Sequence, residues 1–69
     1  MIKDVKDRET YVQNGKELIE WLNIDNEIAA ECTLSIEDCK TEQDYCDFAN
    51  EYELKLNDGM MVREFEVVE

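Results

Sequence analysis

Carboxylates are the side chains of this 69-residue chain whose number and spacing could do chemistry. Between residues 17 and 53 the sequence has twelve Asp and Glu residues and one basic residue, Lys40, so this stretch holds eleven charges of the formal net charge of −12. Clustered carboxylates can act as acid and base, bind cations, or attract a basic macromolecule. Each use requires further residues beside the acids.

Catalysis by paired carboxylates is poorly supported by the other residues. The chain has no His, no glycine-rich phosphate-binding loop and no nucleophile motif. A chain this short also has little room for a cleft that excludes water. Because close pairs arise by chance among nineteen acids, we expect no enzymatic activity, no catalytic residues and no cofactor.

A dedicated metal site is not expected either. An EF-hand loop needs alternating Asp or Asn ligands, a Gly at its sixth position and a Glu at its twelfth, and segments 25–27 and 57–59 lack that order. Cys32, Cys39 and Cys46 are seven residues apart, whereas zinc prefers closer Cys pairs together with His. The odd number of thiols predicts free, buried cysteines in a reducing compartment.

The charge instead favours a basic partner protein. A strongly acidic chain repels nucleic acid and anionic membranes, so we expect neither to be bound directly. The first eight residues lack the apolar region of a secretory signal, and no segment reaches the length of a membrane span. These features predict a cytoplasmic protein.

Aromatic residues inside the acidic stretch indicate a folded domain rather than a disordered acidic tail. Trp21, Tyr45, Phe48 and Tyr52 all lie there, and a solvated tail has little use for such side chains. We expect one domain over residues 1–69, because a chain of this length forms one small core. Trp21 follows Leu18 at i+3 and is predicted to belong to that core.

The first predicted helix ends at Leu22. Apolar residues recur at helical spacing from Glu9 onward. An alternative, shorter helix has Asn14 as its N-cap and Glu17 three residues later, the spacing of a capping box. In both versions Asn23 is a plausible left-handed residue after the helix.

The middle of the chain predicts a strand and then a second helix. Residues 28–36 alternate between apolar and polar side chains, which favours a strand. The alternative is a short helix capped by Asp25 that runs through Ala30. A helix from Thr41 to Asn50 follows, with Thr41 as its N-cap.

The last third of the sequence predicts a β-hairpin. Residues 52–56 alternate, residues 57–59 are Asn-Asp-Gly, and a β-rich run extends from residue 60 to residue 68. A three-residue loop is preferred because it pairs Glu53 with Arg63 instead of with another acid. The expected order is helix–strand–helix–β-hairpin, a small α+β domain with a three-stranded antiparallel sheet.

Carboxylates on and around the second predicted helix are the candidate binding residues. Asp44, Asp47 and Glu51 lie at i, i+3 and i+7, so they form a line of charge with steps of about 4.5 and 6 Å along a helix axis. This spacing loosely matches phosphates, which follow one another every 3.4 Å or so along each strand of duplex DNA. The full set of expected partner-binding residues is Glu37, Asp38, Asp44, Asp47, Glu51 and Glu53.

Two classes of function follow from these features. The first is an inhibitor that mimics nucleic acid and occupies the basic channel of a nuclease or CRISPR effector. In general character, being short, acidic and free of proline, the chain resembles phage-encoded anti-CRISPR and anti-restriction proteins and nuclease immunity proteins. The second class is an acidic adaptor or regulatory subunit that binds a partner through the hairpin edge or through Met60 and Met61.

Overall fold

The computed structural model describes residues 1–7 and 11–68 of the chain. Within them the elements follow in the order β1 (Ile2–Asp4), β2 (Tyr11–Val12), α1 (Gly15–Leu22), α2 (Asn26–Ala29), the 3-10 helix η1 (Ile36–Asp38), α3 (Glu42–Leu56) and β3 (Phe65–Val67). The strands form one antiparallel sheet in the order β2-β1-β3. The predicted class, a small α+β domain with a three-stranded antiparallel sheet, is confirmed. β3 lies within the β-rich run predicted from residue 60 to residue 68, whereas β1 and β2 lie elsewhere in the sequence than the other predicted strands.

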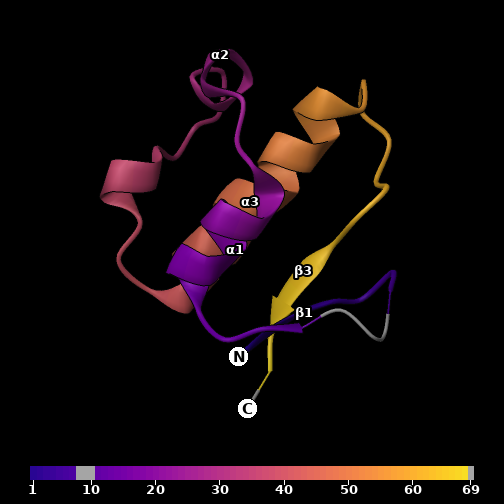
Figure 1. The fold of residues 1–69 in the computed structure, drawn as a ribbon. Helices are drawn as coiled ribbons and strands as arrows, with labels where there is room; N and C mark the ends of the chain where they lie inside the picture. Colours follow the sequence, from indigo (N-terminus) through magenta and orange to yellow (C-terminus); the bar gives the residue numbers. More distant parts are fainter. Residues whose placement is uncertain (8–10, 69) are drawn as a thin grey trace.

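The two ends of the chain meet in this sheet, and they lie close together in Figure 1. Ile2 of β1 is paired with Val12 of β2 on one side and with Val67 of β3 on the other. The central strand is therefore the first element of the chain, and one of its neighbours is the last.

Asp4 is a buried carboxylate at the end of β1, with 4% of its surface exposed. Its Oδ1 accepts hydrogen bonds from the backbone N–H groups of Lys6 (2.9 Å) and Glu64 (3.2 Å). These bonds compensate the carboxylate for lost hydration. No strand was expected at this end of the chain, because an inward-facing Asp conceals the alternation of apolar and polar residues.

Helix α1 begins at the shorter of the two predicted starts. The Asn14 side chain accepts the backbone N–H of Glu17 at 3.0 Å and so caps the helix. The longer helix predicted from Glu9, which lies outside the described residues, is wrong because residues 11–12 are in β2. The expected left-handed residue is confirmed, since Asn23 has a φ of 54°.

The strand predicted over residues 28–36 is wrong, and the alternative helix capped by Asp25 forms instead. Asp25 Oδ1 accepts the backbone N–H groups of Glu27 (2.9 Å) and Ile28 (3.5 Å) at the start of α2. Ser35 then caps η1 with its hydroxyl oxygen. The helix caps Asp25 and Ser35 therefore decide the structure of this segment in spite of its alternating pattern, because residues 28–36 have no neighbouring strand in the described part of the chain with which to pair.

The helix predicted from Thr41 is confirmed and is longer than expected. Thr41 is its N-cap, and α3 continues to Leu56. Asp58 and Gly59 have left-handed φ values of 54° and 87°, and the Gly59 N–H donates to the Leu54 carbonyl at 2.6 Å. The predicted hairpin turn therefore terminates a helix, so the hairpin is wrong.

Strand β3 pairs with β1 and is fastened to α3 by one side chain. Asn50 Oδ1 accepts the backbone N–H of Phe65 at 2.7 Å, and Asn50 Nδ2 donates to the Phe65 carbonyl at 3.1 Å. The Asn50 amide thus satisfies the backbone groups of Phe65 on the side of β3 away from β1. The hairpin edge expected to pair with a partner does not exist.

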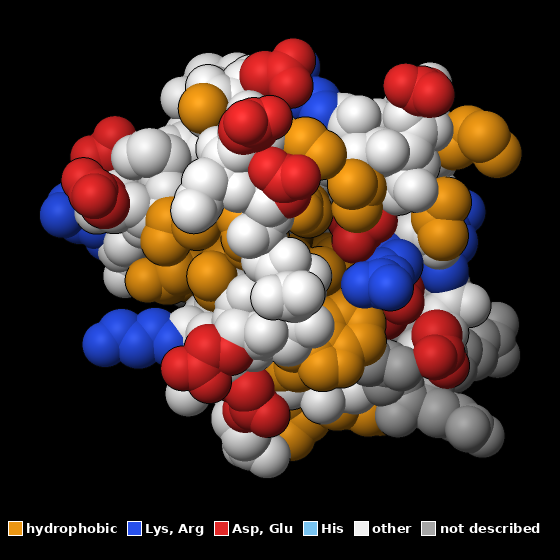
Figure 2. Space-filling view, turned by 45° about the horizontal axis from the view of Figure 1, so that its top comes forward, with side chains coloured by type: hydrophobic (Ala, Val, Ile, Leu, Met, Phe, Trp, Pro, Cys, Tyr) orange, Lys and Arg blue, Asp and Glu red, His pale blue; other side chains and the backbone are white. Residues whose placement is uncertain are grey.

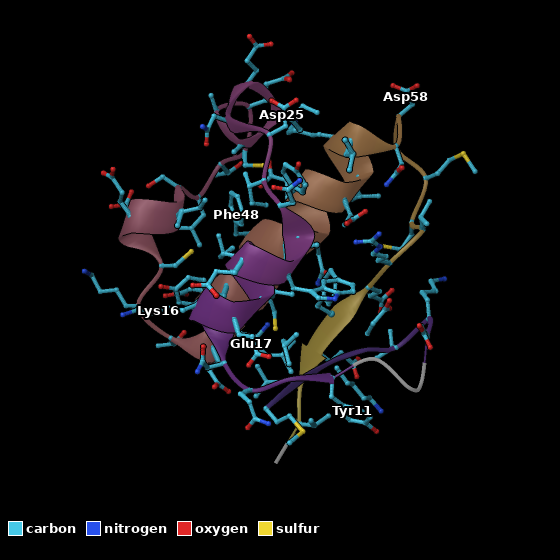
Figure 3. The ribbon with its side chains drawn as sticks, in the orientation of Figure 1. Tyr11, Lys16, Glu17, Asp25, Phe48 and Asp58 are labelled. Carbon is cyan, nitrogen blue, oxygen red and sulfur yellow. The ribbon has the colours of Figure 1, made fainter. Side chains whose placement is uncertain are left out.

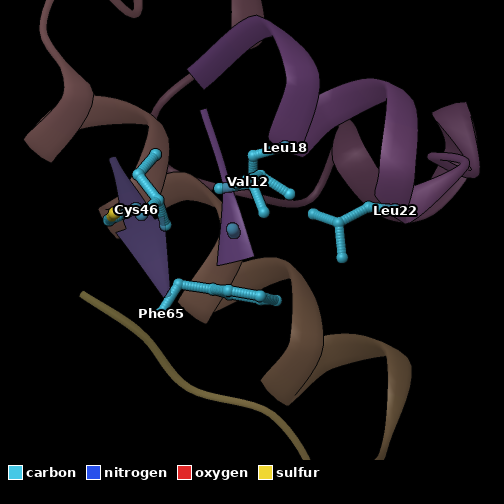
Figure 4. Packing of buried hydrophobic residues seen from close by; sticks show 7 residues of the cluster. Val12, Leu18, Leu22, Cys46 and Phe65 are labelled. Atoms are coloured by element: carbon cyan, nitrogen blue, oxygen red, sulfur yellow. The ribbon is translucent and has the colours of Figure 1, made fainter. Parts of the chain in front are cut away.

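Helix α3 lies between two groups of buried side chains. The first group joins the sheet and α1 to α3 (Figure 4) and consists of Ile2, Val12, Leu18, Leu22, Cys46, Ala49 and Phe65. The second group consists of Cys39, Phe48 and Tyr52 and packs against partly buried side chains of residues 24–36. Figure 3 shows Phe48 on α3 facing the segment that carries η1. Because α3 is covered on both sides, its apolar residues do not form a single stripe.

Tyr52 links the second group to the start of α2. Its hydroxyl oxygen accepts the backbone N–H of Asp25 at 2.8 Å, which fixes the position of that segment over α3. None of the helices within the described residues is long and apolar enough to span a bilayer.

Candidate protein-binding surface

The six carboxylates expected to bind a partner differ in exposure. Glu37 and Asp38 on η1 and Asp47 on α3 are exposed, Asp44 and Glu51 are half-buried, and Glu53 is buried. The helical row of Asp44, Asp47 and Glu51 does lie on α3 as expected. The hydrogen bonds of each acid decide which of them a partner can reach.

Asp44 is part of the N-terminal cap of α3. Its Oδ2 accepts the backbone N–H groups of Lys40 (2.9 Å) and Thr41 (3.2 Å), and the Thr41 hydroxyl accepts the Asp44 N–H at 3.1 Å. These hydrogen bonds, first that from Lys40 and then that from Thr41, hold the pKa of Asp44 below its usual value. The carboxylate is thus charged and is held in one position by the helix start.

Glu51 fastens the irregular segment after α2 onto α3. Its two carboxylate oxygens accept the backbone N–H of Thr33 at 3.1 and 3.0 Å, and Oε2 also accepts the Thr33 hydroxyl at 3.2 Å. The chain after α2 therefore covers this part of the helical row, and Glu51 has a structural role.

Glu53 faces away from that row. It is 2% exposed, its Oε2 accepts a hydrogen bond from Asn57 Nδ2 at 2.9 Å, and its Oε1 forms an ion pair with Arg63 at 3.5 Å. The pairing of Glu53 with Arg63 was expected across a hairpin; here a helix and the loop after it bring the two residues together. A partner has no access to this carboxylate.

Asp38, Asp44 and Asp47 lie near enough to the buried thiol of Cys39 to affect its ionisation. Burial raises the pKa of Cys39, and the nearby carboxylates of Asp44, Asp38 and Asp47 raise it further. Glu37 precedes Asp38 on η1 and is exposed. We call this surface, formed by Glu37, Asp38, Asp44 and Asp47, the η1–α3 acidic face.

The η1–α3 acidic face is open surface rather than the lining of a pocket. No pocket is found over residues 1–7 and 11–68, and within that part of the chain no three acidic or sulfur-bearing side chains are placed to hold a metal ion. In Figure 2 acidic side chains are spread over the visible surface, with exposed hydrophobic side chains between them.

Two of the three cysteines lie inside the protein, as expected of small buried hydrophobic residues, and the third is partly exposed. Cys39 and Cys46 are buried and Cys32 is half-buried, all as free thiols. Burial raises the pKa of Cys46 to about 11, and the carboxylates of Asp47 and Glu42 raise it as well.

Trp21 is the surface residue that sequence reasoning missed. It was expected in the core, but 42% of it is exposed. The guanidinium of Arg63 lies 4.8 Å from the centre of its ring, and the ring of Phe65 meets it edge-on with centroids 6.0 Å apart. The sequence did contain a sign of this exposure, because Trp21 lies at the border of the apolar face of α1 that Leu18 and Leu22 form.

No family model, curated protein or solved structure matches this chain.

Proposed function

We propose that this protein is a non-enzymatic inhibitor that binds the basic, nucleic-acid-binding surface of a partner protein and so excludes nucleic acid from it. The observation that carries the proposal is the excess of carboxylates without cationic partners. Of the twelve acids between residues 17 and 53, those that form an ion pair shorter than 4 Å with a described residue are Glu42, with the N-terminal amine, and Glu53, with Arg63. Uncompensated acids repel one another and cost stability, so their retention supports a role in binding cations on a partner.

The η1–α3 acidic face is the best candidate for the contact. Three of its carboxylates accept hydrogen bonds that hold them in place: Asp44 from the helix start, Asp38 from the Ser35 hydroxyl at 2.9 Å, and Asp47 from Gln43 Nε2 at 2.9 Å. Side chains that are already ordered lose less entropy on binding. Lys40 is the nearest basic residue in the sequence, and its single positive charge does not balance the four carboxylates of the face.

Mimicry of nucleic acid gives this proposal two measurable properties. Binding should weaken steeply as salt is raised, because exposed charges are screened over about 8–10 Å at physiological ionic strength. Nucleic acid should compete with the protein for the same basic channel. A nuclease or a CRISPR effector is the expected class of partner, since such proteins hold nucleic acid in positively charged channels.

Affinity capture with the immobilised protein tests the proposal. A bacterial lysate is applied with and without prior nuclease treatment, bound proteins are eluted with salt and identified, and the purified partner is titrated in the presence of a DNA duplex. We expect a basic nucleic-acid-binding protein whose binding to DNA is inhibited. A partner that DNA does not displace and that stays bound at high salt would contradict the proposal.

A further inference from the structure

Trp21 is exposed yet held in a defined position. Its ring is covered on one side by the Arg63 guanidinium at 4.8 Å and meets the Phe65 ring at an interplanar angle of 84°. Phe65 itself is 3% exposed and belongs to the core. The ring therefore presents an ordered apolar surface to solvent.

Arg63 is held in place by an ion pair with a buried acid, Glu53. Its guanidinium pairs with Glu53 at 3.5 Å, and Glu53 is fixed by Asn57 Nδ2 at 2.9 Å. The buried Glu53 thus positions the Arg63 guanidinium, and the guanidinium in turn positions the ring of Trp21. Such preorganisation lowers the entropy lost when a partner covers the ring.

Further exposed apolar side chains occur close to Arg63 in the sequence. Leu56 in the last turn of α3 is 45% exposed, and Met60 and Val62 in the loop that leads to Arg63 are 67% and 54% exposed. We call the contact pair Trp21 and Arg63, together with the exposed apolar residues that precede Arg63 in the sequence (Leu56, Met60 and Val62), the Trp21 corner. Exposed hydrophobic side chains lie between acidic ones over the surface in Figure 2.

We infer that the Trp21 corner anchors a segment of the partner in which basic and apolar side chains alternate. This inference rests on the proposed function, because the net charge of −12 repels both a second copy of the chain and an anionic membrane and leaves a basic partner as the occupant. The acids Glu20 and Asp58 are exposed beside the apolar residues in sequence. Trp and Arg are the residue types that most often dominate the energy of an interface.

Two synthetic peptides of equal length and charge test the inference. One alternates Lys with Leu and the other alternates Lys with Ser. Trp21 is the only tryptophan of the chain, so its fluorescence reports directly on this corner. We expect both peptides to bind in a salt-dependent manner, but only the Lys/Leu peptide should shift the emission of Trp21 to shorter wavelength.

Variants of the corner separate its contribution from that of charge. Affinities of the variants are measured by isothermal titration calorimetry, because Trp21→Ala removes the fluorescence reporter. Trp21→Ala should weaken binding of the Lys/Leu peptide by about thirtyfold, the loss typical of an interface hot spot, and leave binding of the Lys/Ser peptide unchanged. Val62→Ser removes an exposed apolar side chain without disturbing the Phe65 contact, and it should weaken the Lys/Leu peptide in a chain whose circular dichroism stays native. Tyr11→Ala is the matched control, because Tyr11 is an aromatic residue on β2 that is 53% exposed and is not part of the Trp21 corner.

The outcomes distinguish failure of the corner from failure of the proposed function. Equal affinities for the two peptides, with unchanged Trp21 emission, would overturn the role of the corner and leave binding to basic partners intact. Absence of binding by both peptides at low salt would overturn both. An equal loss in Tyr11→Ala and Trp21→Ala would also overturn the inference, because any exposed aromatic residue would then serve.

Discussion

Replacing Gly15 with Ala should destabilise the protein, although the substitution favours helices in general. A Cβ built at position 15 overlaps the ring of Tyr45 on α3 and lies 2.8 Å from the Tyr45 Cβ. Tyr45 packs against both groups of buried side chains, so the ring has little freedom to move away. Gly15 therefore permits the close approach of α1 and α3.

The expected magnitude follows from two opposing effects. A Gly to Ala change within a helix stabilises by at most about 1 kcal/mol, whereas overpacking a core typically costs about 1–3 kcal/mol. The overlap involves the Tyr45 Cβ as well as the ring, and a Cβ moves only with the backbone, so the upper part of that range applies. We expect a net loss of about 2 kcal/mol, out of a total stability of about 3–10 kcal/mol for a chain of this length.

Urea denaturation followed by circular dichroism measures this loss. Gly15→Ala should lower the midpoint in the wild-type background, and the loss should shrink in a Tyr45→Ala background, where the ring overlap is gone and only the Cβ contact is left. A higher midpoint for Gly15→Ala in the wild-type background would refute the close approach of the two helices, because helix propensity alone would then decide the outcome.

Three further outcomes are expected. Asn50→Ala leaves the backbone groups of Phe65 without their partners and should cost about 2–4 kcal/mol in urea denaturation; an unchanged midpoint would contradict the role of Asn50. Burial raises the pKa of the Cys46 thiol from the ordinary 9.0 to about 11, so the thiol ionises at lower pH in the unfolded chain than in the folded protein. The free energy of unfolding should therefore fall as pH rises from 9.0 toward about 11. Cys46→Ala should reduce that fall, and an equal fall in this variant would refute the role of the Cys46 thiol. The melting temperature should rise from low to moderate sodium chloride, because salt screens the repulsion among the acids; a flat or falling profile would indicate that the acids are already paired.

Helix ends were the most predictable part of the fold. Asn14, Asp25, Thr41 and Asn23 act on backbone groups within three residues of their own positions, so the short sequence windows around them contain the necessary information. The start of α1, the start of α3 and the left-handed residue after α1 could all be predicted in this way.

β3 lies in the β-rich run predicted over residues 60–68, but the pairing of the sheet was not predictable from local pattern, because β1 and β3 come from opposite ends of the chain. Residues 52–56 alternate like a strand, yet they continue α3, whose buried side chains include Tyr52 and Glu53. The partner of β3 is β1, more than sixty residues away along the sequence, and its inward-facing Asp4 conceals the strand pattern. Pairing over such a distance depends on the assembled core.

The candidate surface was predictable in position but not in exposure. The row of acids lies on one helix as its spacing requires. Whether each acid is exposed depends on the segment between α2 and α3, which places Thr33 on Glu51, and on the loop after α3, which places Arg63 on Glu53. Arg63 of the same loop also contacts the ring of Trp21, which is at the surface.

The central claim is that the η1–α3 acidic face binds a basic nucleic-acid-binding partner locally, and paired charge reversals test it most directly. Glu37→Lys/Asp47→Lys changes two exposed acids of that face. The control, Glu27→Lys/Glu66→Lys, changes two exposed acids of α2 and β3 and alters the net charge equally. Circular dichroism should remain native in both variants.

The decisive measurement is the affinity of each variant for the purified partner at one fixed salt concentration. Like charges facing one another across an interface cost several kcal/mol, whereas a charge elsewhere affects mainly the rate of association. We predict that Glu37→Lys/Asp47→Lys loses far more affinity than Glu27→Lys/Glu66→Lys. Equal losses, or a larger loss in the control, would contradict the claim.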